Sequence, residues 1–235
     1  MYRALDADRI VATAHKLRQR ITERFPEASL ARVSGELCGA AEETTARLDQ
    51  LSRPRWGLRA ATGFLIVLIL AIAGVAITSL HLPASFHDLG AFVQALEAGI
   101  NDAVFVAIAM AFLVTIETRI KRQAALRALH ELRSLAHIVD MHQLTKDPDQ
   151  FLGARTATAS SPARTLTAFE LNRYLDYCSE LLSVISKVAA LYAQRMNDPV
   201  VLGAVNEVEG LTTGLSNKIW QKLVILERTA SGSPG

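Results

Sequence analysis

Three polar residues interrupt an otherwise apolar segment, at Glu97, Asn101 and Asp102. An ionisable side chain within a membrane-spanning helix is costly, and it usually faces water or the interior of a helix assembly. In an oligomer, these three side chains would form an acidic ring at the outer mouth of a cation pore. The alternative, which we favour, is that Asp102 caps the start of its helix, where a carboxylate suits the helix dipole.

The other titratable residues do not form a recognisable catalytic or metal-binding motif. His130, His137, Asp140 and His142 gather in one segment, but none of the pairs has the HExxH form. We therefore favour a solvated cluster over a metal site. The sequence also lacks a glycine-rich phosphate loop and a GxSxG elbow. We expect no catalytic residue, no cofactor and no metal, and hence a protein that is not an enzyme.

A row of small residues recurs every fourth position through the same apolar segment. Small residues at this spacing let helix backbones approach closely in lipid, where packing drives association. Two partners for the row remain open: the preceding apolar run, with small residues at 71, 74 and 78, or a second subunit. The row consists of Ala95, Gly99, Ala103, Ala107, Ala111 and Thr115.

These residues belong to the second of two apolar runs, which predict a membrane hairpin over residues 53–120. The first run has no charge between residues 60 and 80, and about twenty apolar residues suffice to cross a bilayer. The second reaches spanning length only when it is extended back to Ala98. We predict spans at 58–80 and 98–118 with a loop at 81–97, and Trp56 at the membrane surface. A soluble hairpin is disfavoured because the first run is uninterrupted.

The basic residues predict the orientation of the hairpin. The loop contains no lysine or arginine, whereas basic residues flank both runs on the other side. Such residues favour the cytoplasm, so both termini are expected there. They are also candidates for contact with anionic lipid, and they comprise Arg53, Arg55, Arg59, Arg119, Lys121 and Arg122.

Composition is consistent with a helical protein of modest charge. Half of the 235 residues are hydrophobic, few are aromatic, and the net charge is +2. Alanine and leucine favour helices, and no nucleic-acid partner is expected. Cys38 and Cys178 are expected to be reduced packing residues. With no cleavable signal expected, the first span would act as an uncleaved anchor.

Residues 1–52 are predicted to form two amphipathic helices, at 8–25 and 27–51. The first has a basic face opposite its apolar stripe, so it would either pack on its own domain or lie on anionic lipid. Packing is favoured. The second has a spacing that permits a coiled-coil-like seam.

Residues 121–230 are predicted to form a cytoplasmic helical bundle. One helix continues out of the membrane from 117 to 144, and a flexible loop follows at 153–165. A capping box at Thr167 and Glu170 starts a helix to about 196, and Asp198 and Pro199 start another to about 228. Residues 231–235 form a disordered tail. Trp220 and the tyrosines at 174, 177 and 192 are predicted to be packing residues.

Two segments, HIVDMHQLTKDPDQ at 137–150 and DPVVLGAVNEVEGLTTGLSNKIWQ at 198–221, resemble uncharacterised bacterial two-span inner-membrane proteins. This resemblance implies a bacterial membrane location and no activity. The order of coil, span, acidic loop, span and coil also resembles small oligomeric cation channels and two-span pore-forming effectors. None of their filter motifs is present.

We therefore expect an all-α protein with a two-helix transmembrane hairpin and long cytoplasmic helices that form a bundle. The favoured function is a non-enzymatic, self-associating membrane module that acts as a scaffold or sensor. Its expected partners are the lipid bilayer, further copies of the chain and a cytoplasmic protein. The alternative is an oligomeric cation-conducting pore.

Overall fold

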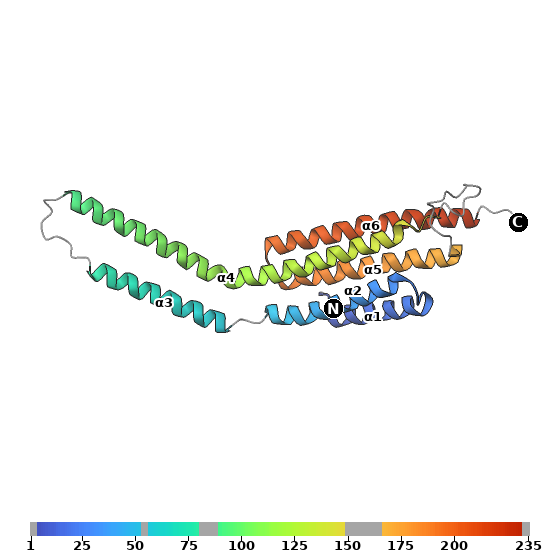
Figure 1. The fold of residues 1–235 in the computed structure, drawn as a ribbon, viewed down its shortest axis with the longest axis horizontal. Helices are drawn as coiled ribbons and strands as arrows, with labels where there is room; N and C mark the ends of the chain where they lie inside the picture. Colours follow the sequence, from blue (N-terminus) through green and yellow to red (C-terminus); the bar gives the residue numbers. More distant parts are fainter. Residues whose placement is uncertain (1–3, 53–55, 80–88, 149–165, 232–235) are drawn as a thin grey trace. The chain divides into compact units, whose positions relative to one another are not determined.

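The computed structural model describes residues 4–52, 56–79, 89–148 and 166–231, and the regular structure within them is entirely helical. The helices are α1 (Ala7–Arg24), α2 (Ser29–Ser52), α3 (Trp56–Ser79), α4 (Leu89–Leu144), α5 (Ala168–Arg195) and α6 (Pro199–Ser231), shown in Figure 1. The chain divides into two compact units, residues 53–123 and the remainder. The predicted loop at 153–165 and most of the tail lie outside the described residues.

Short side-chain caps set the ends of several helices. Asp6 accepts a hydrogen bond from the backbone N–H of Arg9 at the start of α1, and α1 ends at Phe25. Thr167 and Glu170 form the predicted capping box, in which each side chain accepts from the other residue's backbone N–H. These contacts satisfy amides that have no partner within the helix.

The turn between α5 and α6 also forms as predicted. Met196 ends α5, and Asp198 Oδ1 accepts from the N–H groups of Val200 and Val201. Pro199 occupies the first position of α6, where its missing N–H costs nothing. The two antiparallel helices therefore begin and end close to the positions that the sequence indicates.

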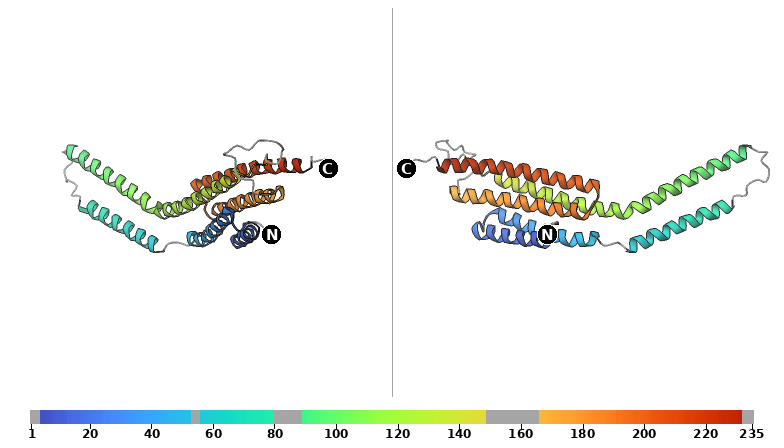
Figure 2. Two further views of the ribbon diagram at one scale, coloured as in Figure 1. Left: turned by 45° about the vertical axis from the view of Figure 1, so that its right-hand side comes forward. Right: turned by 180° about the vertical axis from the view of Figure 1, so that it is seen from behind.

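The larger unit, residues 1–52 and 124–235, has one hydrophobic core. The core contains the apolar faces of α1, α2, the C-terminal part of α4, α5 and α6. Figures 1 and 2 show α5 between α6 and the pair formed by α1 and α2. The apolar stripe of α5 is buried at helical spacing, at Leu171, Leu175, Cys178, Leu182, Ile185, Ala189 and Tyr192.

The N-terminal helices belong to the same compact unit as residues 124–235. The apolar stripe of α1 is buried, at Ile10, Ala14, Leu17 and Ile21. Arg20 donates two hydrogen bonds to Glu180 of α5, at 2.8 and 3.2 Å. The apolar face of α1 is therefore used for packing, and it is not available to enter lipid.

Candidate functional site

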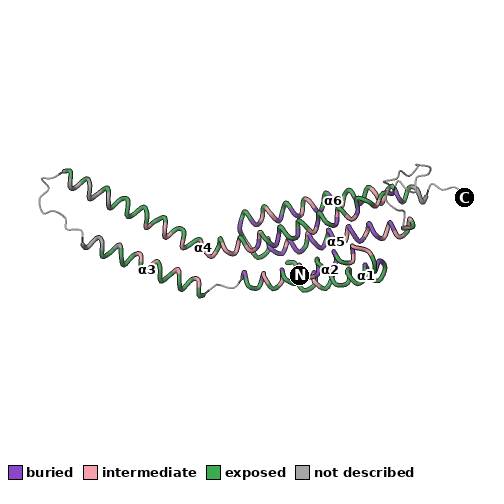
Figure 3. Tube along the Cα trace, in the orientation of Figure 1, coloured by how far each residue is buried: buried purple, intermediate pink, exposed green. Residues whose placement is uncertain are grey.

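The candidate site is the apolar pair made by α3 and the first part of α4. Large apolar residues are exposed along both helices. Figure 3 colours much of the described trace of this pair green, for exposed residues. Phe64 is 68% exposed, Val67 65%, Phe105 71% and Ile108 62%. Burying one such side chain contributes about 1.5–3 kcal/mol, so this surface would be strongly unfavourable in water. Two helices of the described chain are long and apolar enough to cross a membrane.

Charged groups gather at one end of this pair. Glu117 of α4 accepts hydrogen bonds from Arg59 of α3 at 2.7 Å and from Lys121 at 2.9 Å. The predicted pairing of Glu117 with Lys121 is confirmed, whereas the contact with Arg59 was not anticipated. The guanidinium of Arg119 lies over the ring of Phe112. Arg53 and Arg55 lie outside the described residues.

Along α3 and the first part of α4, half-buried and exposed side chains lie on different faces of each helix. The half-buried residues of α3 recur at helical spacing, at Leu58, Thr62, Ile66 and Ile69. Those of α4 form a similar stripe, at Val106, Ala109, Leu113, Ile116 and Ile120. Only the remaining faces are fully exposed to the surroundings of the hairpin.

The described members of the small-residue row lie on exposed surface. Gly99, Ala103, Ala107, Ala111 and Thr115 are all exposed. On α3, Ala71 and Gly74 are exposed too. A Cβ atom added at Gly74 or Gly99 would meet nothing within 4 Å. The row is therefore not used for close packing between α3 and α4 of one chain.

The structure corrects the capping interpretation of Asp102. Helix α4 begins at Leu89, so Asp102 lies well inside the helix and cannot cap its start. Because α4 begins at Leu89, residues 89–97 of the predicted loop at 81–97 are also helical. Residues five apart on an α-helix are separated by about 140°, so Glu97 and Asp102 point to different faces. Asn101 shares a face with Glu97, and all three side chains are exposed.

The histidine segment of α4 does not gather a metal-binding set. His130 and His137 are exposed, and Asp140 accepts a hydrogen bond from Gln143 at 2.6 Å. Burial, with Arg32 and Lys146 nearby, lowers the pKa of His142. Within the described residues, no group of three metal-ligating side chains is close enough to hold an ion.

Polar groups inside the larger unit are mainly occupied in holding helices together. Tyr192 donates to Thr44 at 3.3 Å, and the hydroxyl of Thr212 is bonded to the carbonyl of Val208. Lys222 of α6 donates to two carbonyls near the end of α4, those of Gln143 at 2.7 Å and Lys146 at 3.1 Å. Desolvation lowers the pKa of Lys222.

The aromatic residues divide between core and surface. Tyr174, Tyr177 and Tyr192 are buried, as predicted. Trp220 is 64% exposed, so its predicted packing role is wrong. The helical spacing that suggested burial places Trp220 beside the core-facing stripe of α6 but not within it.

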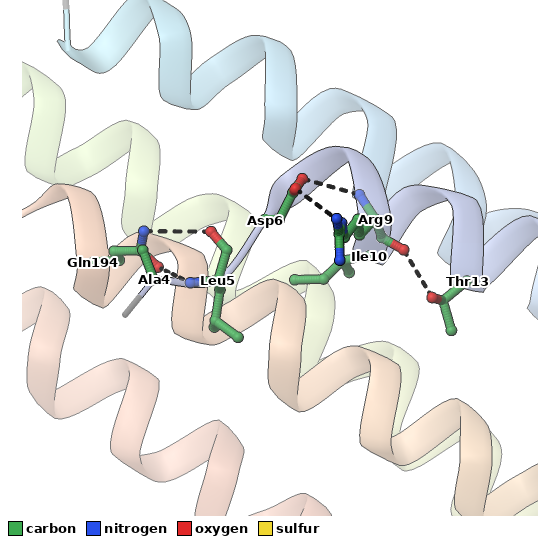
Figure 4. A pocket seen from close by; sticks show the side chains of 7 residues that line it. All are labelled: Ala4, Leu5, Asp6, Arg9, Ile10, Thr13 and Gln194. Atoms are coloured by element: carbon green, nitrogen blue, oxygen red, sulfur yellow. Dashed lines mark hydrogen bonds and ion pairs between the residues drawn. The ribbon is translucent and has the colours of Figure 1, made fainter. Parts of the chain in front are cut away.

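A hollow of about 570 Å³ lies where the start of α1 meets the end of α5. Figure 4 shows Gln194 paired with the backbone of Leu5, whose N–H donates to Gln194 Oε1 at 2.9 Å. The amide of Gln194 returns a longer bond to the carbonyl of Leu5, at 3.4 Å. These contacts fasten the N-terminal segment to α5, and the side chains around them offer no nucleophile with a base.

Comparisons with protein-family models, with curated proteins and with solved structures each give no match to this chain. The resemblance to bacterial two-span membrane proteins therefore remains a prediction.

Proposed function

We propose that this chain is an integral membrane protein whose hairpin anchors a helical scaffold or sensor module. The observation that carries the proposal is the contrast between the two units. The larger unit buries its apolar stripes in one core, whereas α3 and the first part of α4 expose theirs. A bilayer favours such a surface because its hydrocarbon core is apolar. Helices can cross that core because they satisfy their own backbone hydrogen bonds.

The proposed location is a bacterial inner membrane with both termini in the cytoplasm. The segment between the spans lacks lysine and arginine, and the basic residues flank the other ends. Positive residues are retained on the cytoplasmic side. The cluster of Arg59, Glu117 and Lys121 would then lie at the inner surface, where the exposed Arg59 reaches anionic headgroups.

Self-association is the second part of the proposal. The small-residue row from Gly99 to Thr115 is exposed and is not used within one chain. A row with a step of four is inclined to the helix axis, and packing two such rows gives a right-handed crossing. We propose that α4 packs against α4 of a second copy along this row.

An enzymatic role is not part of the proposal. The buried hydroxyls of Tyr192, Thr44 and Thr212 are engaged in structural hydrogen bonds. Burial raises the pKa of the Cys178 thiol to about 12, which leaves it protonated and unreactive at neutral pH.

Membrane extraction and native mass spectrometry test the two parts separately. The protein should stay with membranes in alkaline carbonate and be released by detergent. In detergent it should be oligomeric, and Ala107→Leu should shift it toward monomer because the larger side chain separates the helices. Phe105→Trp enlarges an exposed side chain on the other side of α4 and should leave the oligomer intact. Release by carbonate would overturn the proposed membrane insertion. A monomeric parent protein would overturn the proposed self-association.

A cation-conducting pore is the second candidate, and the position of Asp102 favours it. The capping role does not apply, so an ionisable residue within an apolar helix requires another purpose. Asp102 lies on the face of α4 that carries the half-buried stripe, whereas Glu97 points to a different face. Only one of these two carboxylates can therefore line a lumen. Ion flux into liposomes should then fall in Asp102→Asn and be unaffected in Glu97→Gln. Equal flux in the parent and Asp102→Asn would contradict the pore.

A further inference from the structure

A surface groove of about 350 Å³ runs between α2 and α4 in the larger unit. Gly39 and Ala40 of α2 line one side, and Leu135 and Ile138 of α4 line the other. Ile138 is 39% exposed, and Met141, one turn further along α4, is 65% exposed. The floor of the groove is therefore apolar and accessible.

The groove has room for another side chain. A Cβ atom added at Gly39 would meet no atom within 4 Å, although Gly39 lies in the middle of a helix. Glycine in a helix interior costs about 1 kcal/mol relative to alanine. Gly39 therefore leaves room in this groove for a side chain of another helix.

The charged side chains that line the groove are acidic. Glu36, Glu43 and Glu131 border it, with His130 and Ser134 between them. Arg47 closes one end, donating to Glu43 at 2.6 Å and to Glu131 at 3.3 Å. The guanidinium of Arg47 thus pairs with two of the three carboxylates, Glu43 and Glu131. Two further arginines, at 18 and 32, line a separate hollow that shares Glu36 with this groove.

We propose that the groove between α2 and α4 docks a basic amphipathic helix of a partner protein. This inference rests on the proposed function, because it names the partner that the module would bind. An apolar side chain of the partner would enter between Ala40 and Ile138, while lysine or arginine reaches Glu36 and Glu43. A symmetric contact with a second copy is disfavoured because it would bring like charges together.

The test measures binding of a labelled peptide to the full chain in an uncharged detergent. The probe is a synthetic helix with leucine on one face and lysine beside it, and a matched peptide carries glutamate in place of lysine. By fluorescence anisotropy, the lysine peptide should saturate and should bind more weakly as salt rises. Equal binding of the glutamate peptide would overturn the proposal.

Two variants locate the site. Gly39→Trp should fill the groove and weaken binding about tenfold or more, as expected for loss of a central pocket. The matched control is Gly203→Trp, since Gly203 is an exposed glycine of α6 that also has open space around it. Unchanged binding in Gly39→Trp would overturn the proposal, as would equal loss in both variants.

A charge substitution keeps the test valid if Gly39→Trp fails to fold. Ile138→Lys changes an exposed position, so the fold should persist while the charge repels the basic helix. Binding of the lysine peptide equal to that of the parent would contradict docking in the groove. The assay needs no bilayer, so its failure is distinguishable from a failure of the membrane proposal, which carbonate extraction measures.

Discussion

At the scale of single residues, the larger unit places ionisable groups where burial controls their protonation. Burial raises the pKa values of Cys178, Tyr174 and Tyr192, because each loses solvation for its charged form. Lys222 shifts in the opposite sense for the same reason. In all four groups burial disfavours the charged form relative to solvent, as expected in the interior of packed helices.

The raised pKa values of the thiol and the two phenols predict loss of stability at alkaline pH. An acid with a raised pKa in the folded state holds its proton while the unfolded chain releases it, so stability falls as pH rises. For Cys178, the window runs from about 9 upward, with a folded pKa of about 12. There the parent should lose up to about 1.4 kcal/mol per pH unit more than Cys178→Ala. Denaturation midpoints in detergent between about pH 8 and 10.5 measure this difference, and parallel curves would contradict it.

At the scale of elements, helix ends and buried stripes could be predicted because they depend on local chemistry. The capping box at Thr167, the turn at Asp198 and Pro199, and the core stripe of α5 all follow from spacing along one helix. The start of α4 was misplaced because the polar residue Asp102 was interpreted as a cap at the start of the helix, which begins at Leu89. The roles of Asp102 and Trp220 were misjudged for a related reason. Residue spacing shows which face of a helix a side chain lies on, but not what packs against that face.

One lysine that the sequence did not single out joins the end of α4 to α6, beside the shared core and the Arg133–Glu207 ion pair. Lys222 donates to the carbonyl of Gln143 in α4 and to that of Lys146 just beyond its end, and the Gln143 carbonyl also accepts from the N–H of Lys146. Lys222→Met removes both bonds of the lysine and should cost about 1–3 kcal/mol of unfolding free energy.

Hydrogen exchange gives the more specific measurement for this variant. Amides of residues 140–147 should exchange faster in Lys222→Met, because the end of α4 loses its tie to α6. Lys218→Met is the matched control, since Lys218 is an exposed lysine one turn away on the same helix. Equal effects of the two substitutions would show that the two bonds of Lys222 contribute nothing.

At the scale of the whole molecule, the two units differ in where their apolar side chains lie. Those of residues 53–123 are largely exposed, as the proposed membrane anchor requires, whereas the larger unit buries its apolar side chains in one core. Because α4 belongs to both units as one helix, it is the element that joins the proposed membrane anchor to the cytoplasmic module. The partner groove and the small-residue row then lie on different stretches of α4, so docking and self-association need not compete for one surface.

This division predicts which cysteines a membrane-impermeant maleimide can reach. Cys38 and Cys178 are buried, so the folded parent should label little on either side of the membrane. Ser85→Cys, between the proposed spans, should label in intact bacterial spheroplasts. Gly203→Cys, on exposed α6, should label only after the membrane is opened, because both termini are proposed to face the cytoplasm. Labelling of Gly203→Cys in sealed spheroplasts would reverse the orientation, and labelling of both variants there would exclude a hairpin that crosses the bilayer.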